Sequence, residues 1–210
     1  MFDRFYLIVD DVAWIERLLP HGLRLVQLRI KEQPDDEIRR QIALARSLCA
    51  DAGAQLIVND YWRLAIEAGC DFVHLGQEDL DTADIAAIRR AGLRLGISTH
   101  DEIELDRALL LMPDYIALGP IFPTRLKKMK WDQQGVERVR EWRRRIGRIK
   151  LVAIGGLTPE RAIEVLAAGA DSAAVVTDIL LHPDPVGRLQ QWIAATRESE
   201  AASPARQSTT

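Results

Sequence analysis

The sequence predicts a single α/β domain that closes into an eight-fold (β/α) TIM barrel, and three observations lead to this prediction. Eight short apolar runs rich in β-branched residues are spaced along the chain, and amphipathic segments separate them in strict alternation. The length of 210 residues suits a compact barrel with short connections. Alternation of this kind requires parallel strands joined by helical crossovers. An open doubly wound sheet is the alternative, because strand number alone does not prove closure.

The eight predicted strands are all short. In chain order they cover residues 5–10, 23–30, 54–60, 72–76, 93–99, 114–122, 150–156 and 171–177.

The segments between these strands carry helix signals. Residues 35–53 place apolar side chains near helical spacing and end in Gly, and residues 61–69 are long enough for only about two turns. Thr158 followed by Pro159 is typical of a helix start, with Thr158 as the N-cap. We therefore expect one barrel domain over residues 1–195. The small, polar residues 196–210 are predicted to be a disordered tail.

Composition favours a cytoplasmic enzyme or binding protein. The chain is 48% hydrophobic and 28% charged, with a net charge of -3, so it lacks the positive excess typical of nucleic-acid binders. No apolar run approaches the length of a membrane span, and no signal peptide is recognisable. Cys49 and Cys70 have no metal-ligand spacing and are expected to be reduced thiols.

Polar and ionisable residues collect where the predicted strands end, which is where a barrel enzyme carries its active site. Gln27, Arg29 and Lys31 alternate along the second strand, a spacing that places all three side chains on one face. Three polar groups pointing inward are costly unless they meet a polar ligand. The alternative is a strand end that emerges into solvent with ion-paired basic residues.

Two strand ends finish on carboxylates. Asp60 ends the third predicted strand and Asp79 follows the fourth, so the two side chains are expected to be neighbours. Mg²⁺ takes one or two carboxylates together with water and substrate phosphate, and this pair suits it. The alternative is that both residues cap the helices that follow.

The last strands end in Gly155–Gly156 and Val176–Thr177, positions that often bind phosphate in barrels. Residues 124–130 form a basic stretch that is a plausible lid carrying Lys127. His74 lies within an apolar strand and is interpreted as a core histidine. His100 lies at a strand end, where catalytic, structural and capping roles all stay open.

Five ordered segments resemble the thiamine-phosphate synthase family: "VQLRIK", "LIVNDYWRLAIEAGCDFVHLGQEDL", "LGISTHDEIE", "YIALGPIFPT" and "LVAIGG". The resemblance extends over about residues 5–180. It implies an Mg²⁺-dependent transferase that joins hydroxymethylpyrimidine diphosphate to a thiazole phosphate, carboxylated or not, and yields thiamine phosphate and pyrophosphate. A dissociative departure of pyrophosphate is expected.

The resemblance also implies roles for matching positions. Asp60 and Asp79 would hold Mg²⁺, and Arg29, Lys31, Ser98 and Lys127 would be catalytic. The pyrimidine diphosphate would contact Gln27, Leu28, Arg29, Ile30, Lys31, Asn59, Ser98 and Lys127. The thiazole phosphate would contact Thr124, Arg125, Leu126, Gly156, Val176 and Thr177.

Two positions depart from the family pattern. Leu126 replaces a usual Thr, so only backbone contact is expected there. Asp178 stands where a small residue is usual and would repel a phosphate unless it points away.

Two other functions remain open from the sequence. A thiazole tautomerase on the same barrel would need an acid or base such as His100. A non-catalytic protein that binds a phosphate ligand is the second. The expected partners are small-molecule substrates, with neither nucleic acid nor membrane, and a homo-oligomer stays open.

Overall fold

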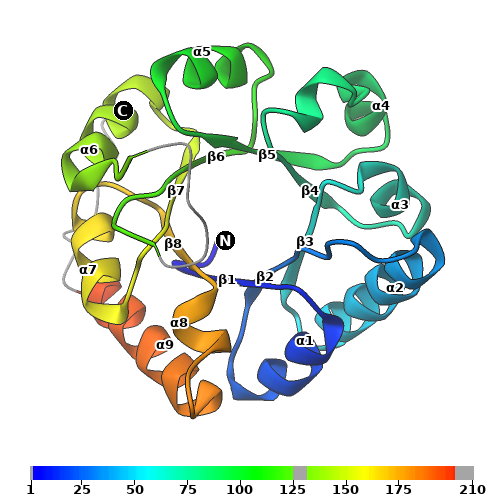
Figure 1. Ribbon diagram of the computed structural model, residues 1–210, viewed down its shortest axis with the longest axis horizontal. Helices are drawn as coiled ribbons and strands as arrows, with labels where there is room; N and C mark the ends of the chain where they lie inside the picture. Colours follow the sequence, from blue (N-terminus) through cyan, green and yellow to red (C-terminus); the bar gives the residue numbers. More distant parts are fainter. Residues whose placement is uncertain (1, 125–131, 202–210) are drawn as a thin grey trace.

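The protein is a closed, all-parallel eight-stranded barrel, seen in a computed structural model that describes residues 2–124 and 132–201. The strands follow chain order around the ring, and β1 pairs with β8 through Phe5 and Ala173. Figure 1 shows the ring of strands enclosed by a ring of helices. The predicted barrel is confirmed, and closure between β1 and β8 excludes the open sheet.

The strands are shorter than the sequence predicts. They are β1 Phe5–Val9, β2 Leu25–Leu28, β3 Gln55–Asn59, β4 Phe72–Leu75, β5 Arg94–Thr99, β6 Tyr115–Leu118, β7 Lys150–Ile154 and β8 Ser172–Val175. The largest difference lies at β6, which ends four residues before the predicted end at 122. Pro120 explains part of this difference, because it has no N–H group for a strand ladder.

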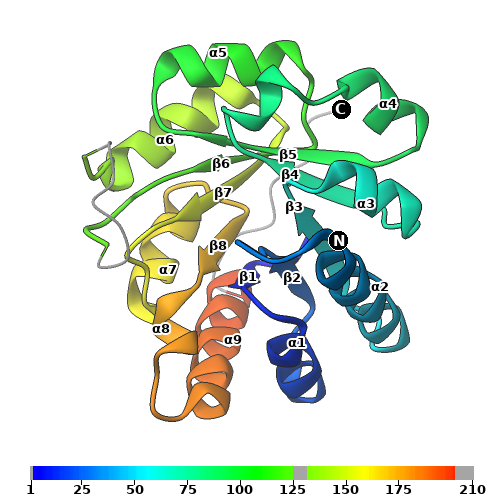
Figure 2. The same cartoon turned by 45° about the vertical axis from the view of Figure 1, so that its right-hand side comes forward.

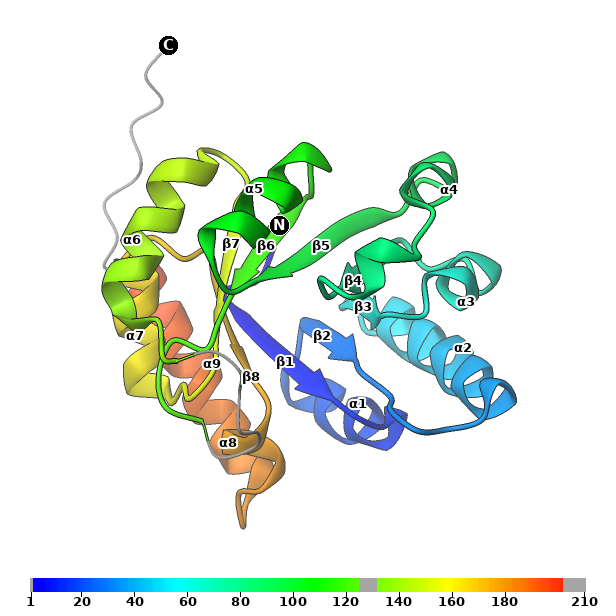
Figure 3. The same ribbon diagram turned by 45° about the horizontal axis from the view of Figure 1, so that its top comes forward.

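Helices connect the strands and cover the outside of the barrel (Figures 2 and 3). They are α1 Val12–Leu18, η1 Leu19–His21, α2 Asp35–Asp51, α3 Trp62–Glu67, η2 Asp79–Asp81, α4 Ile85–Arg90, α5 Glu102–Leu110, α6 Gly135–Ile146, α7 Pro159–Ala167, α8 Thr177–Leu180 and α9 Pro185–Ala201. The predicted cap is present, since the Thr158 hydroxyl accepts a hydrogen bond from the Arg161 backbone N–H. In the part of the chain that is described, no helix has the length and apolarity to cross a membrane.

The last helix continues past the predicted end of the domain. α9 continues to Ala201, six residues beyond the expected end at 195. Thr196 is buried in this extension, and its hydroxyl donates to the carbonyl oxygen of Trp192. A short-range pattern does not reveal this burial, because the contacts come from elements distant in sequence. Residues 202–210 of the predicted tail lie outside the described residues.

Two apolar layers hold the barrel together. A large outer layer lies between strands and helices, and it includes Cys49 and Cys70. Both are free thiols, and burial raises their pKa to about 12 and about 11 respectively. A small inner layer fills the barrel with Tyr6, Ile8, Leu25, Ile57, Phe72, Tyr115, Ala117, Val152 and Ala174. The inner layer forms the floor on which the functional site rests.

Candidate active site

A cavity of about 330 Å³ opens at the C-terminal ends of the strands, and every strand contributes to its lining. Eight of the residues predicted for substrate binding line it: Gln27, Arg29, Asn59, Ser98, Thr124, Gly156, Val176 and Thr177. These residues are as much as 150 positions apart in the chain and meet only because the barrel closes. The structure therefore brings these residues together at the C-terminal ends of the strands, the location that the sequence predicts.

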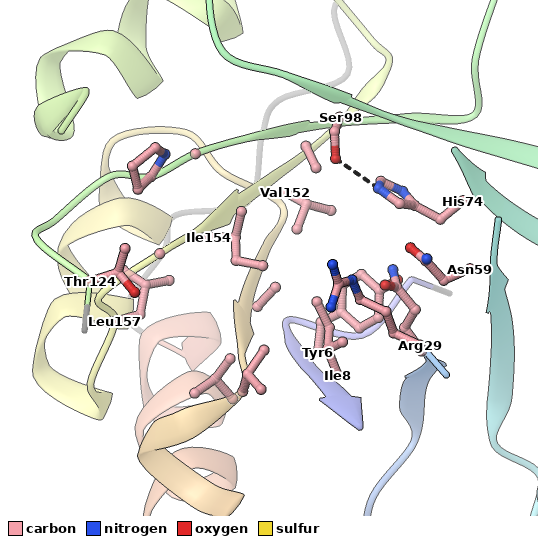
Figure 4. A pocket seen from close by; sticks show the side chains of 18 of the residues that line it. Tyr6, Ile8, Arg29, Asn59, His74, Ser98, Thr124, Val152, Ile154 and Leu157 are labelled. Carbon is pink, nitrogen blue, oxygen red and sulfur yellow. Dashed lines mark hydrogen bonds between the residues drawn. The ribbon is translucent and has the colours of Figure 1, made fainter. Parts of the chain in front are cut away.

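The cavity has two chemically different sides. Figure 4 shows Arg29, Asn59, His74 and Ser98 on one side and Thr124 with Leu157 on the other. The apolar side chains of Val152 and Ile154 lie between them (Figure 4). A cationic, hydrogen-bonding side and a separate loop side across an apolar middle suit ligands whose polar groups lie at opposite ends of the cavity.

The second strand gives only two of its three polar side chains to the cavity. β2 ends at Leu28, and the backbone N–H of Arg29 donates to the carbonyl of Val9 at 2.8 Å. Gln27 and Arg29 line the cavity, whereas Lys31 lies past the strand end and donates to an Asp60 carboxylate oxygen at 2.5 Å. Lys31 is therefore placed beside Asp60, and its position on the same face as Gln27 and Arg29 stays a prediction.

Leu28 and Ile30 belong to the outer layer and are almost fully buried. Their side chains pack between strands and helices, so a ligand in the cavity would meet only their backbone.

Asp60 and Asp79 are neighbours, as the sequence predicts. Burial, followed by the negative charge of Asp60, raises the pKa of the Asp79 carboxyl. The Asp79 carboxylate also accepts a 2.9 Å hydrogen bond from the backbone N–H of Gly76, which fixes its orientation. Two carboxylates that repel each other at a partly buried site favour a cation between them.

Capping does not explain this pair of carboxylates. The N-cap of α3 is Tyr61 and that of η2 is Glu78, and neither helix start has a side-chain cap. Asp60 instead adopts a left-handed backbone with φ of 63°, and its N–H donates to the carbonyl of His74 at 2.9 Å. The turn therefore ties the carboxylate to the end of β4.

The donor set fits Mg²⁺ in composition. Within residues 2–124 and 132–201 there is no group of three or more His, Cys, Asp or Glu side chains arranged to hold a metal. Mg²⁺ needs only one or two carboxylates and takes its other ligands from water and substrate phosphate. Asp60 and Asp79 meet that requirement, and Lys31 supplies a positive charge at the same place.

The turns after β6 and β7 form one packed unit beside the cavity. The backbone N–H groups of Ile121 and Phe122 donate to the carbonyls of Ile154 and Gly155 at 2.9 and 3.0 Å. Gly156 has φ of 65°, and a Cβ there would lie 2.5 Å from the carbonyl oxygen of Pro123. Only glycine fits this turn, which exposes the backbone to the cavity.

Arg161 of α7 contacts the turns after β6 and β7. Its guanidinium donates to the Gly156 carbonyl at 2.6 Å and lies over the ring of Phe122, 4.5 Å from the centroid. These contacts explain how one residue of α7 orients both loops.

Asp178 points away from the cavity. Arg188 of α9 donates two hydrogen bonds to its carboxylate, at 2.8 and 3.1 Å, and the indole N–H of Trp192 donates a third at 2.7 Å. The neighbouring Val176 and Thr177 line the cavity, and Asp178 does not. The carboxylate that departs from the family pattern is thus neutralised by an ion pair and anchors α8 to α9.

His74 is a buried histidine with a hydrogen-bond partner at each ring nitrogen, and it also lines the cavity. Its Nδ1 is 2.6 Å from the Tyr115 hydroxyl and its Nε2 is 2.8 Å from the Ser98 hydroxyl. Burial lowers the pKa of the imidazole to about 4, the Asp60 charge opposes this shift, and Arg29 adds to it. The ring is therefore neutral at pH 7.

Tyr6 and Tyr115 also line the cavity, and neither is among the site residues that the sequence predicts. A signal exists for Tyr6, which shares the two-residue alternation of Ile8 and Asp10 along the first strand. Burial raises the pKa of both phenols above the usual range.

His100 is held by Glu104 at the rim of the cavity. The Glu104 carboxylate accepts from the backbone N–H of His100 at 2.8 Å and lies 2.7 Å from its Nδ1. The N-cap of α5 is Asp101, whose carboxylate accepts from the Glu104 N–H, so Glu104 joins His100 to the capped first turn while the His100 ring lines the cavity.

Three predicted residues, Arg125, Leu126 and Lys127, lie outside the described residues. Their assigned roles stay predictions.

Comparisons with known proteins agree with this geometry. The family described as thiamine monophosphate synthase matches residues 5–179. A thiamine-phosphate synthase of Rhizobium etli is 64% identical over 92% of this chain and 95% of that protein. One from Cronobacter sakazakii is 51% identical over 90% of each chain.

A solved structure shares the fold as well. The thiamine phosphate pyrophosphorylase from Pyrococcus furiosus superposes with a TM-score of 0.83 at 28% identity, covering 93% of this chain and 96% of that one. Family match, similar relatives and shared barrel point the same way, and the chain belongs to the thiamine monophosphate synthase family.

Proposed function

We propose that this chain couples hydroxymethylpyrimidine diphosphate to a thiazole phosphate, forming thiamine phosphate and releasing pyrophosphate. Its family and its similar relatives carry this activity in their names. The observation that supports it in this chain is the two-sided cavity, with Arg29 and Asn59 facing Thr124 and Leu157 across an apolar middle (Figure 4).

The proposed reaction transfers the pyrimidinylmethyl group from the diphosphate to the thiazole nitrogen. The C–O bond between the pyrimidine methylene and the diphosphate breaks, and its electron pair leaves with the pyrophosphate. The aminopyrimidine ring delocalises the positive charge, and the thiazole nitrogen then donates its lone pair to form the new C–N bond. No protein nucleophile is needed, so positioning and charge stabilisation carry the catalysis.

The polar side of the cavity supports this chemistry. Negative charge grows on the departing pyrophosphate, and Arg29 lines the cavity where that group would lie. Lys31 and Lys127 are proposed to add further positive charge, Asn59 and Ser98 to donate hydrogen bonds, and Gln27, Leu28 and Ile30 to shape the pyrimidine side.

The loop side is proposed to hold the thiazole phosphate. Thr124, Gly156, Val176 and Thr177 line the cavity there, and Arg125 and Leu126 are proposed to contribute from the same loop.

Mg²⁺ is proposed to bind Asp60 and Asp79. When bound, the ion would neutralise charge on the diphosphate and lower the cost of its departure. The raised pKa of Asp79 beside Asp60 supports a cation at this place.

The cellular setting is also proposed. With a net charge of -3 and small-molecule substrates, the enzyme is expected to act in the cytoplasm without nucleic acid or membrane as partner.

Two variants separate the synthase from the tautomerase. We expect Lys127→Ala to lower both kcat and kcat/KM for coupling by about 100-fold, since removal of one charged stabiliser costs that much in comparable sites. His100→Ala is expected to have a milder effect, because coupling requires no proton shuttle. The measurement follows thiamine phosphate and pyrophosphate release with both substrates and Mg²⁺.

The tautomerase alternative demands the opposite order, with His100 essential and Lys127 dispensable. A wild-type protein without coupling activity, whose tautomerase activity is lost in His100→Ala, would overturn the proposal. Binding of the thiazole phosphate without turnover of either kind would instead support a non-catalytic protein.

The metal assignment has its own test. Asp60→Asn and Asp79→Asn should each raise the Mg²⁺ concentration for half-maximal activity at least about ten-fold, since each removes one of two carboxylate ligands. Asp81→Asn is the matched control, because Asp81 lies two residues away, is largely exposed and pairs with Arg107. Unchanged Mg²⁺ dependence in both test variants would exclude the assignment.

A further inference from the structure

A continuous chain of hydrogen bonds crosses the floor of the cavity and connects five strands. The Gln27 amide nitrogen donates to the Tyr6 hydroxyl at 2.7 Å, and this hydroxyl lies 3.1 Å from that of Tyr115. The chain continues from Tyr115 to His74 Nδ1 at 2.6 Å and from His74 Nε2 to Ser98 Oγ at 2.8 Å. Figure 4 shows its final step, the contact between His74 and Ser98.

The residues of this hydrogen-bond network are buried and closely packed. Gln27, Tyr6, Tyr115 and His74 are all nearly or fully buried. The rings of His74 and Tyr115 stack with centroids 5.4 Å apart and an angle of 13° between planes. A buried polar group without a partner is costly, so each member must be matched by a donor or an acceptor.

The Gln27 amide determines which atom donates in each hydrogen bond of this network. An NH₂ group can only donate, so the Tyr6 oxygen accepts there and its own proton must go to Tyr115. Tyr115 then donates to Nδ1 of His74, so Nδ1 carries no proton and the ring proton lies on Nε2. That N–H donates to Ser98 Oγ.

The opposite set of donors and acceptors, with hydrogen bonds donated from Ser98 toward Tyr6, leaves one group unsatisfied. If Ser98 donated to Nε2, His74 would donate from Nδ1 to Tyr115, and Tyr115 would donate to Tyr6. The Tyr6 oxygen would then accept from both Tyr115 and Gln27, and the Tyr6 proton would be left in a buried site with neither of these two partners as an acceptor. Only one polarity satisfies every member.

We infer that Gln27, Tyr6, Tyr115 and His74 act as a positioning relay that leaves the Ser98 hydroxyl as a hydrogen-bond donor to substrate. With its oxygen accepting from His74, the Ser98 hydroxyl keeps its own proton for a ligand in the cavity, which Ser98 lines. This step rests on the proposed function for the ligand, the pyrimidine diphosphate. Its ring nitrogens and diphosphate oxygens are hydrogen-bond acceptors.

The decisive measurement is the tautomer of His74, and it needs no turnover. The protein is labelled with nitrogen-15 histidine, and the His74 signals, among those of four histidines, are assigned with a His74→Gln variant. Nitrogen-15 shifts distinguish a protonated from an unprotonated ring nitrogen. The expected wild-type result at pH 7 is a neutral ring with its proton on Nε2. A proton on Nδ1, or an imidazolium, would overturn the inference even if coupling activity is normal.

The variant Gln27→Met tests whether the Gln27 amide fixes the donor and acceptor roles in the network. Met has similar length but neither donates nor accepts strongly, so the Tyr6 proton can serve either direction. The His74 signals should then show a mixture of both tautomers. A pure Nε2–H signal in this variant would show that Gln27 does not set the direction.

Kinetics of two hydroxyl deletions test the relay in catalysis. Tyr115→Phe keeps the ring stacked on His74 and should lower kcat about ten-fold, the worth of one hydrogen bond, with little change in KM. Tyr6→Phe removes a more distant link and should cost less. The melting temperatures of the wild type and of both variants are measured as well. If they are equal, or if their order differs from the order of kcat, the loss of kcat is due to positioning and not to a loss of stability. A kcat unchanged in Tyr115→Phe would overturn the catalytic part while leaving the proposed function intact.

Discussion

Asp60 combines a strained backbone with the carboxylate proposed for Mg²⁺. Its φ of 63° lies in the left-handed region, which costs a residue with a Cβ about 1 kcal/mol or more. Hydrogen bonds offset part of this cost, since its N–H donates to His74 and its carbonyl accepts from Trp62 at 2.7 Å. The strained turn also lets the carboxylate meet both Lys31 and Asp79.

Protonation of His74 should govern stability in mild acid. Its pKa falls from 6.5 in the unfolded chain to about 4 in the fold, chiefly through burial. Between these values the unfolded state binds a proton that the folded state does not, so stability decreases as pH falls from 6.5 toward 4. The full effect is about 3 kcal/mol.

Urea unfolding at several pH values checks this effect. His74→Gln should flatten the slope between pH 6.5 and 4, and His21→Gln removes an exposed histidine as control. A slope identical to wild type in His74→Gln would contradict a neutral, buried imidazole.

At the level of elements, the loops after β6 and β7 behave as one unit. Their backbones are hydrogen-bonded through Ile121 and Phe122, and Arg161 of α7 clamps Gly156 against Phe122. The thiazole side of the cavity therefore depends on a turn that tolerates no side chain.

Gly156→Ala should disrupt this unit. The new Cβ would lie 2.5 Å from the Pro123 oxygen and 2.8 Å from that of Phe122, so backbone must move. We expect a loss of about 3 kcal/mol in unfolding free energy and a higher KM for the thiazole phosphate.

Gly92→Ala provides the matched control. Gly92 also has positive φ, at 77°, but nothing lies within 4 Å of the position that a Cβ would take there. It should cost only about 1 kcal/mol for the backbone and leave the KM unchanged. Equal losses in the two variants would mean that close packing at Gly156 is unimportant.

At the scale of the whole molecule, α9 covers the place where the barrel closes. It packs against α7, α8 and β1, and the ring of Trp192 lies 5.6 Å from that of Phe5 on the first strand. Arg188 and Trp192 also hold Asp178 of α8, the helix that follows β8. One helix thus connects the first strand to the segment that follows the last strand, beside the cavity.

Two truncations test how far this helix is needed. Ending the chain after Ala195 removes the buried Thr196 and should lower the melting temperature by about 4 °C, equivalent to roughly 1 to 2 kcal/mol. Ending it after Ala201 removes only residues 202–210 and should leave the melting temperature at the wild-type value. Equal melting temperatures for both truncations would place the end of the domain at 195, as the sequence predicts.

The sequence by itself determined the parallel α/β architecture and the end of the strands at which the polar residues gather. Strict alternation of strand and helix signals requires parallel strands, and polar residues at strand ends then share one face whatever the details of packing. Asn59, Ser98 and Gly156 could be placed for this reason. The proximity of Asp60 and Asp79 was predictable too, because neighbouring parallel strands end side by side.

Only the tertiary structure decided how individual side chains are paired. Tyr6 and Tyr115 are 109 residues apart, and their contact depends on ring closure rather than on any local pattern. The same holds for Asp178, whose charge is cancelled by Arg188 on another helix. Local periodicity fixes which face a side chain occupies, whereas its partners depend on distances across the barrel, which exist only once all eight strands have closed.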